Sequence, residues 1–427
     1  MRGAAIARAD AVNEGKQKAT GRPLGAARIR LKPEVGLQVI GENLRRPANL
    51  QPGGVFVLTR VAFVLLAYFG YILFKSILHG PHPSFTHQLL PAWNRWDSVW
   101  YTDIAQRGYG WRRPAGTSPT AFFPLYPLLI HVVMVVTRRS ALVSALAISN
   151  ACFLGALLYL WRLTKWELNE DTARRATLYI ATFPTALFFF AGYTESLFLL
   201  VTVACFYYMR RREWFVAGVC IGLASATRVT GILLLVPLAY EYARHCNFRP
   251  RQMLASGLLG LLIAPSGLLA FMLYLWRVVD DPFAFSHNQA AWQKVFTPRI
   301  WAGLVETLRQ IFVIQPGASF YEAHNLLNLG AAAMFLCATF VVARRLPASY
   351  TLYLVGFWLI TLSDPAVEGG YPVPLISMSR YVLSLFPVFM YLGVLGGRRW
   401  FHDGYLVVST ALLALLTLQF VTGGWVV

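Results

Sequence analysis

Apolar runs long enough to cross a lipid bilayer recur from Val55 to the C-terminus of this 427-residue chain. A helix needs roughly 20 mostly apolar residues to span the hydrocarbon core, where only helices and closed barrels satisfy their backbone hydrogen bonds. A barrel would show short alternating segments, whereas these runs are continuous. Only 13% of the residues are charged, against about a quarter in soluble domains. The sequence therefore predicts an all-α polytopic membrane protein.

The apolar runs predict eleven membrane spans. These are expected at 55–78, 142–162, 174–192, 195–210, 214–227, 230–243, 254–278, 323–343, 349–363, 381–396 and 404–424. A further apolar stretch, residues 121–137, is short for a span and carries two prolines. If it also crosses, the count becomes twelve, and every later segment changes its orientation.

The net charge of +19 is distributed between the apolar runs. Clusters of this kind mark cytoplasmic loops, and no basic strip interleaved with aromatics suggests nucleic-acid binding. If 121–137 does not cross, the main clusters share the side of the basic N-terminus: Arg162, Lys165, Arg174, Arg175, Arg210 to Arg212, Arg244, Arg249, Arg251, Arg344, Arg345, Arg398 and Arg399. We therefore predict that 121–137 is re-entrant or lies in the outer interface, with the N-terminus inside.

This topology divides the chain into a tail and one membrane domain. Residues 1–54 are expected to be a basic cytoplasmic tail without the apolar core of a signal peptide, and 55–427 a single transmembrane domain. Residues 79–120 form the first outer loop. The five cysteines show neither CxxC nor metal-like spacing, so free thiols are expected.

The first outer loop contains the sequence PAWNRWDSVWYTDIAQRGYGW, residues 91–111. A carboxylate among tryptophan rings at the membrane edge is partly desolvated, which suits a general base, and Asp97 is the candidate. Trp96, Trp100 and Tyr101 beside it are expected to contact substrate. The alternative is that Asp97, which precedes Ser98, only caps a short helix.

Two arginines stand in apolar surroundings on the same predicted face: Arg228, in SATRVTGILLL, and Arg380, in SMSRYVLSLFP. A buried arginine is costly unless it pairs or reaches an interface, and two of them can hold a lipid phosphate by bidentate hydrogen bonds. The alternative is that both extend to the lipid headgroups. Glu195 is a candidate for binding substrate hydroxyls with Tyr193, or a helix N-terminal charge.

The loop at residues 280–292, DDPFAFSHNQAAW, adds Asp280, Asp281 and His287. His287 is a candidate substrate ligand. Adjacent carboxylates can bind a divalent cation, but a turn before a proline is the commoner arrangement, so no metal or other cofactor is expected. The nucleotide-binding motifs GxxxxGK[ST] and GxGxxG and the metalloprotease motif HExxH are missing from the sequence.

Six motifs in order carry a resemblance: RWDSVWYTDIAQRGY, FFPLYPLL, FPTALFFFAGYTESLF, ATRVTGILLL, DPFAFSHNQAAW and SMSRYVLSLFP. Together they resemble the PIG-V family of GT-C membrane glycosyltransferases, over residues 55 to 396. The resemblance implies a GT-C fold with short juxtamembrane helices in the first outer loop. Asp97 matches the essential aspartate of that loop.

The resemblance also implies a hexosyltransferase. It would take a sugar, mannose in the family, from a polyprenyl-phosphate donor and pass it to a glycolipid or other glycan at the outer face. The short loops suggest a prokaryotic homologue in the inner membrane, for which the acceptor is open. The competing class is a transporter or flippase of a lipid-linked sugar. A transferase would have its groove beside the outer loop, a transporter through its centre.

Overall fold

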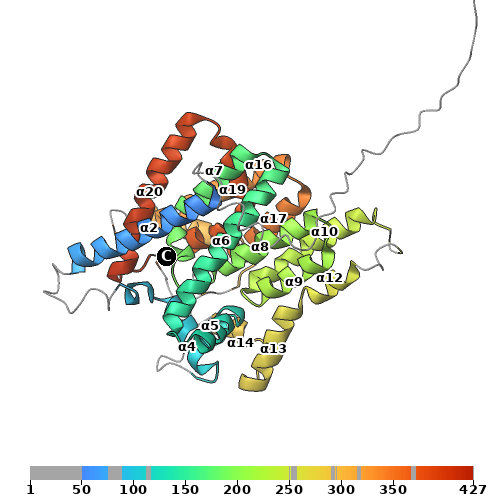
Figure 1. The fold of residues 1–427 in the computed structure, drawn as a ribbon, viewed down its shortest axis with the longest axis horizontal. Helices are drawn as coiled ribbons and strands as arrows, with labels where there is room; N and C mark the ends of the chain where they lie inside the picture. The colour runs from blue at the N-terminus through green and yellow to red at the C-terminus, as the bar shows by residue number, and fades with distance from the viewer. Residues whose placement is uncertain are drawn as a thin grey trace, which may run out of the picture. The chain divides into compact units, whose positions relative to one another are not determined.

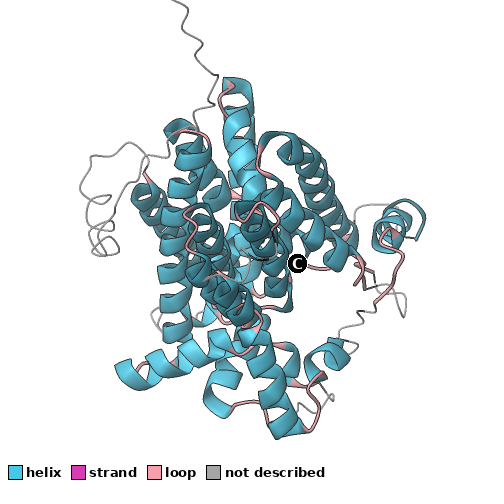
Figure 2. Ribbon diagram, turned by 90° about the vertical axis from the view of Figure 1, so that its right-hand side faces the viewer, coloured by secondary structure: helices cyan, strands magenta, loops and turns pink. Residues whose placement is uncertain are grey.

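The computed structural model describes residues 51–75, 89–111, 117–249, 251, 257–289, 294, 296–314, 319–366 and 372–426. These residues form helices and no strand, as Figure 2 shows. The predicted all-helical architecture is thus confirmed for the described part of the chain. The predicted N-terminal tail lies outside it, except for residues 51–54.

In the described part of the chain, five helices are long and apolar enough to cross a membrane. A sixth candidate is a pair of segments, Met378–Ser384 and Phe386–Leu395, bent by 84°. The five are Pro52–Phe74 (α2 Pro52–Gly70 with η1 Tyr71–Lys75), α6 (Ala141–Glu167), Leu258–Val279 (α12 Leu258–Ile263 with α13 Ser266–Val279), α16 (Phe320–Arg345) and α20 (Arg399–Thr422). All six coincide with predicted spans, so the chain is a multi-pass membrane protein.

The other five predicted spans correspond to shorter helices, and the count of eleven is not confirmed. They are α7 (Glu170–Thr182), α8 (Glu195–Arg210), α9 (Trp214–Ser225), α10 (Leu235–His245) and α17 (Ala348–Leu362). The predicted 174–192 helix is interrupted because Pro184 follows it: Phe183 takes an extended conformation, with ψ of 146°, as residues before proline do. Only the short η5 (Ala186–Phe189) follows.

Short helices gather around the first predicted outer loop, as expected. They are η3 (Pro91–Trp93), α4 (Asp97–Arg107) and η4 (Pro119–Ala121). The uncertain segment 121–137 contains α5 (Leu125–Thr137), whose 13 residues extend about 20 Å. Figure 1 draws α4, α5 and α14 (Ala284–His287) together at the lower edge of the helices, and α7 and α19 (Phe386–Leu395) above its centre.

The remaining elements of the described chain are η6 (Val229–Leu234), α15 (Ala302–Arg309), η8 (Gln310–Ile314), α18 (Met378–Tyr381) and η10 (Val382–Ser384).

Glycine allows α9 and α12 to pack with their backbones in contact. A Cβ on Gly218 would lie 2.0 Å from the carbonyl oxygen of Gly260, and one on Gly260 would lie 2.2 Å from that of Trp214. Membrane helices associate through such small residues because lipid removes most of the hydrophobic drive between them. A third glycine packs η6 on α9, because a Cβ on Gly231 would lie 2.2 Å from the carbonyl carbon of Ala224. This contact lies close to Arg228, the N-cap of η6.

One membrane helix, α2, contains an arginine that the span prediction did not consider. The guanidinium of Arg60 lies 4.6 Å from the ring centre of Phe153 and 5.0 Å from that of Phe56, and Phe63 and Phe190 are also within 6 Å. Its three nitrogens are buried without a hydrogen-bond partner. Cation–π attraction to four rings is therefore what compensates its charge.

Candidate active site

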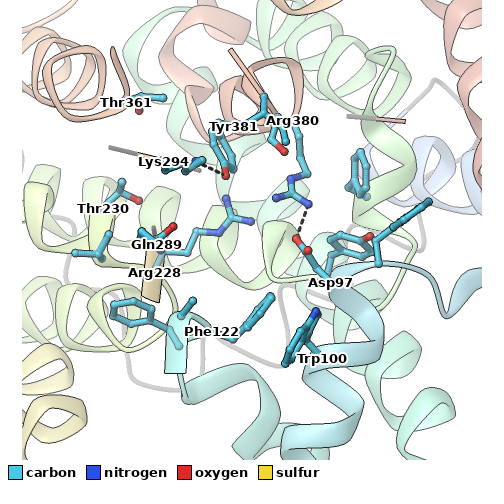
Figure 3. Close-up of a pocket in the computed structure, with 18 of the residues that line it drawn as sticks. Asp97, Trp100, Phe122, Arg228, Thr230, Gln289, Lys294, Thr361, Arg380 and Tyr381 are labelled. Atoms are coloured by element: carbon cyan, nitrogen blue, oxygen red, sulfur yellow. Dashed lines mark hydrogen bonds and ion pairs between the residues drawn. The ribbon is translucent and has the colours of Figure 1, made fainter. Parts of the chain in front are cut away.

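A cavity of about 840 Å³ lies against α4. Charged and polar side chains enter it from segments far apart in the sequence, among them Asp97, Arg228, Lys294 and Arg380, shown in Figure 3. Aromatic and apolar groups complete the wall: Trp100, Phe122, Phe123, Phe357 and Ile360. An apolar cavity with a few convergent charged groups is the usual form of a ligand site.

Asp97 is the first residue of α4 rather than its cap. The N-cap is Trp96, whose side chain makes no capping bond and whose backbone has φ of 53° and ψ of −117°. A non-glycine residue seldom adopts this conformation, which costs about 1–3 kcal/mol and must be imposed by the surrounding structure. The carboxylate Oδ2 of Asp97 instead accepts a hydrogen bond from Arg380 Nη1 at 2.7 Å.

A close contact between Gly192 and Ser98 fixes the start of α4. Gly192 packs directly on Ser98, because a Cβ on this glycine would lie 2.6 Å from Ser98 Oγ and 3.3 Å from Ala145 Cβ. Ser98 Oγ in turn donates to Asn94 Oδ1 at 2.9 Å. The position of the Asp97 carboxylate therefore depends on the absence of a side chain at Gly192.

Arg380 is held by the backbone of α18. That helix begins after Ser377, which is in the left-handed region with φ of 63°. The N–H of Ser379 donates to Asn328 Oδ1 at 2.9 Å, and its carbonyl accepts from Thr185 Oγ1 at 2.7 Å. Two distant segments thus fix the residue next to Arg380, and the guanidinium enters the cavity with its side chain only 10% exposed.

Arg228 and Arg380 meet at one buried carboxylate. Arg228, the N-cap of η6, forms an ion pair through Nη2 with Glu195 Oε1, and its Nε donates to Thr194 Oγ1 at 2.9 Å. Arg380 Nε lies 3.2 Å from the same Glu195 oxygen, without hydrogen-bond geometry. Arg228 therefore points inward and does not extend to the headgroups. Glu195 also occupies the first turn of α8, as the helix N-terminal interpretation expects. It is not among the residues that line the cavity, and its binding to substrate hydroxyls stays a prediction.

The other predicted residues of the first loop line the same cavity. Trp100 is buried, with Trp111 at 5.6 Å and Phe122 at 5.3 Å stacked on its ring. Tyr101 Oη lies 3.5 Å from Thr194 Oγ1. Trp96 is half-exposed at the cavity edge.

Tyr193 lines the cavity, but its hydroxyl is already engaged. It donates to the carbonyl of Arg95 at 2.9 Å, while the ring centre lies 5.5 Å from the guanidinium carbon of Arg380. In this arrangement Tyr193 supports both the loop before α4 and the cation, and its ring rather than its hydroxyl faces the site.

His287 lies away from these groups. Its side chain is 68% exposed, and Nδ1 is 2.8 Å from Asp281 Oδ2. The hydrogen bond with His287 lowers the pKa of Asp281, whose other oxygen accepts from the N–H of Phe283 at 2.9 Å. His287 is not among the residues that line the cavity. In the described ranges no three His, Cys, Asp or Glu side chains are grouped as metal ligands; that no metal is needed stays a prediction.

Two cavity residues were missed from the sequence. Lys294 Nζ donates to Tyr381 Oη at 3.2 Å and lies 4.0 Å from Asp364 Oδ2. The ring centre of Tyr381 is 5.0 Å from Lys294 Nζ, 5.3 Å from the Arg380 guanidinium and 5.8 Å from that of Arg228. Three cations thus surround one phenol (Figure 3). In the sequence, these two residues could have been found only by their closeness to predicted site residues: Tyr381 follows Arg380, and Lys294 comes shortly after the 280–292 motif.

A sequence model described as Mannosyltransferase (PIG-V) matches residues 61–302, more than half of the chain. The chain belongs to this family. The matched range includes Asp97, Glu195, Arg228 and Lys294, whereas Arg380 lies beyond it. The resemblance found in the sequence is confirmed.

The curated relatives of this PIG-V chain include GPI mannosyltransferase 2 of Yarrowia lipolytica, 24% identical over 61% of this chain and 68% of that protein. The protein of the same name from Cryptococcus neoformans is 28% identical over 38% of this chain and 39% of its own length. GPI alpha-1,6-mannosyltransferase 2 of Mus musculus is 28% identical over 36% of this chain and 33% of its own length. The chain therefore spans well under half of the latter two relatives.

Solved structures similar to this PIG-V chain include ArnT from Cupriavidus metallidurans bound to undecaprenyl phosphate. The identity is 13% and the TM-score 0.48, over 86% of this chain and 77% of that one. The Archaeoglobus fulgidus oligosaccharyltransferase gives a TM-score of 0.42 at 14% identity, over 87% of this chain and 56% of that one. A transporter or flippase is not favoured, because the family is one of mannosyltransferases and the cavity lies beside the first loop.

Proposed function

We propose that this chain transfers mannose from a polyprenyl-phosphate carrier to a hydroxyl group of a lipid-linked or cell-surface acceptor, with inversion at the anomeric carbon. The observation that carries the proposal is the contact of a candidate base, Asp97, with a candidate phosphate ligand, Arg380, in the wall of one cavity. Membership of the PIG-V family supports mannose as the sugar.

The charge of the site supports a phosphate-linked donor. Asp97 and Glu195 balance Arg228 and Arg380, so an incoming phosphate must replace one carboxylate as the partner of an arginine. The side chain of Glu195 is 2% exposed and that of Asp97 is 24% exposed. Asp97 is the more accessible carboxylate, so the phosphate replaces it on Arg380 while Glu195 holds both guanidiniums in place.

This exchange prepares Asp97 for its role. A carboxylate released from its cation has an oxygen free to accept a proton. Asp97 then accepts the proton of the acceptor hydroxyl as that oxygen attacks the anomeric carbon of the donor. Binding of the donor thereby generates the base that the reaction needs.

In the transfer step, the bond from the acceptor oxygen to the anomeric carbon forms as the bond from that carbon to the phosphate oxygen breaks. The departing polyprenyl phosphate gains negative charge, which fixed arginines in a site of low dielectric stabilise better than water does. A single displacement inverts the anomeric carbon, so a β-linked donor gives an α-mannoside. The proton ends on Asp97 and the electron pair on the phosphate.

The orientation of the site follows from the positive-inside rule, which puts α4 and its neighbours at the outer face. The donor would reach this face within the membrane, and the aromatic wall of the cavity suits an isoprenoid chain. We further propose a prokaryotic inner membrane as its location. The GPI activity in the relatives' names is theirs, and the acceptor here is a glycolipid or another glycan.

The test is transfer of label by the purified full chain in liposomes that contain radiolabelled polyprenyl-phosphate mannose, with a membrane extract as the acceptor pool. We expect Asp97→Asn to lower the initial rate by at least about 100-fold, since a general base contributes on that order. The matched control is Asp103→Asn, which removes a carboxylate from the same helix, α4, with no place in the cavity wall.

Three outcomes separate the parts of this proposal. Label transfer by wild type and Asp103→Asn alone supports both the activity and the base. Equal transfer by all three proteins removes Asp97 from the mechanism. No transfer by any folded protein, with folding checked by thermal unfolding, rejects the donor and calls for other lipid-linked sugars.

A further inference from the structure

A second cavity, of about 430 Å³, lies between the start of α7 and the junction of α19 with α20. Its charged lining is mainly basic: Arg174, Arg175, Arg399 and His402, with Asp171 as the one acidic residue among those that line it in the described chain. We refer to it as the basic cavity. None of its residues takes part in the proposed reaction.

The basic cavity is at the opposite end of the helices from the candidate active site. α20 begins there with Arg399, and the residues that follow its C-terminal end, Trp425 and Val426, line the first cavity. The 24 residues of α20 extend about 36 Å, close to the thickness of a bilayer. The bent α18–α19 pair runs in the opposite direction, from Arg380 at the first cavity to Gly396 at the basic cavity. The two cavities therefore lie near opposite membrane surfaces.

Two arginines of the basic cavity have no carboxylate to balance them. Arg174 is paired with Glu170 at 2.9 Å and lies 3.8 Å from Asp171. Arg175, in contrast, donates from Nε to the carbonyl of Gly393 at 2.7 Å, which fixes its guanidinium without cancelling its charge. Among the described residues, neither Arg175 nor Arg399 has an ion-pair partner. The cavity thus keeps a net positive charge.

The N-terminus of α20 adds to this charge. Its N-cap is Arg398, no side chain caps the helix, and no acidic residue lies in the first turn. The first N–H groups of a helix need acceptors, and the helix dipole favours an anion at this end. An anion at this end of α20 would be favoured by the helix dipole and by the two arginines together.

The surroundings of the basic cavity indicate that this anion belongs to a lipid. Trp400, next to Arg399, is 71% exposed, as expected of a ring at headgroup depth. Exposed apolar residues continue along α20 at helical spacing, at Val407, Val408 and Leu415. These side chains share the side of α20 that carries Trp400, so this side faces the lipid, and the acyl chains of a lipid bound in the cavity would lie next to it.

We propose that the basic cavity binds the phosphate headgroup of an anionic phospholipid, with Arg175, Arg399 and the N-terminus of α20 as ligands and the acyl chains along α20. Basic pockets between membrane helices are suited to such headgroups. This site is independent of the transferase activity proposed above.

Native mass spectrometry of the full chain in detergent tests the proposal, with equal amounts of phosphatidylglycerol and phosphatidylcholine of the same acyl chains. We expect wild type to retain phosphatidylglycerol preferentially and Arg399→Gln to lower that preference about fivefold, as loss of one arginine near a lipid phosphate does. The matched control is Arg345→Gln, which removes an exposed arginine from the C-terminal end of α16. Its preference should equal that of wild type.

A second variant and a second ligand keep the outcome decisive. Arg175→Gln combined with Arg399→Gln should abolish the preference; if that protein does not fold, Arg399→Gln alone decides. Equal losses in Arg399→Gln and Arg345→Gln would show a non-specific charge effect and overturn the proposal. It is also overturned if inorganic phosphate stabilises wild type against thermal unfolding while phosphatidylglycerol does not, because the site then takes free phosphate.

Discussion

Arg380 Nη1 lies 2.7 Å from Asp97 Oδ2, so the cation expected to hold the donor phosphate already holds the carboxylate expected to act as base. The two functions are coupled through one guanidinium. A substitution at either residue should therefore change both the binding of the donor and the state of the base.

We expect Arg380→Lys to lower turnover about 100-fold even though the positive charge is kept. A lysine has no planar fork with which to contact Asp97 and Glu195 together, and loss of one fixed donor to a developing charge costs on this order. Single-turnover transfer from radiolabelled donor measures the effect. Arg277→Lys, at the exposed end of α13, is the control and should keep the wild-type rate. A similar rate for both variants would contradict the role of Arg380.

Glu195→Gln should destabilise the protein strongly. Its carboxylate is nearly fully buried and is close to both Arg228 and Arg380. Removal of one partner from a buried ion pair leaves an uncompensated charge, at a cost of about 3–5 kcal/mol. Thermal unfolding in detergent is the measurement. Glu213→Gln breaks the partly exposed pair with Arg211 and should change stability by less than about 1 kcal/mol. Equal shifts of the two unfolding midpoints would argue against a buried cluster.

Gly192→Ala should reduce activity through the position of α4. The added methyl group would meet Ser98 Oγ, and overpacking of this kind costs about 1–3 kcal/mol. Because the closest contact is with one hydroxyl group, Ser98→Ala in the same protein should restore part of the rate. Gly330→Ala, where a Cβ has open space, serves as the control. If the double variant is no more active than Gly192→Ala, this contact does not position Asp97.

Lys294→Met should weaken donor binding more than it slows transfer. Lys294 contacts neither Asp97 nor Glu195 within ion-pair distance, but it adds a third cation to the cavity wall. A hydrogen bond to a charged group contributes about 1.5–3 kcal/mol, so KM for the donor should rise about tenfold or more, with kcat little changed. Tyr381→Phe, which removes only the hydroxyl that Lys294 contacts, should have a smaller effect. A fall in kcat at constant KM would place Lys294 in the transfer step instead.

The sequence was most informative where a charge stood in apolar surroundings. Arg228, Glu195 and Arg380 were found because an ionised residue in a membrane segment is costly and needs a reason. Their pairing was not predictable, because hydropathy does not report which helices meet. Glu195 was expected to bind substrate or to be a helix N-terminal charge; in the structure it is the partner of Arg228 and lies close to Arg380.

The sequence was least informative about Lys294 and about the lengths of the short helices. A lysine beside a polar loop gives no signal, so its entry into the cavity depends on tertiary structure alone. The five short helices were predicted as spans because the apolar runs continue past their ends. The break at Pro184 depends on one residue, which a hydropathy pattern does not weigh.

The separation of Asp97 and Arg380 along the chain determines when the site can be completed. Glu195 and Arg228 are 33 residues apart and can pair early in synthesis, whereas Arg380 follows Asp97 by 283 residues. Since chains emerge from the N-terminus and segments fold as they appear, the growing protein exposes its carboxylate long before the matching cation exists. Insertion of α18 is therefore the last step of biogenesis that this centre requires, and a chain that ends before it has no complete site.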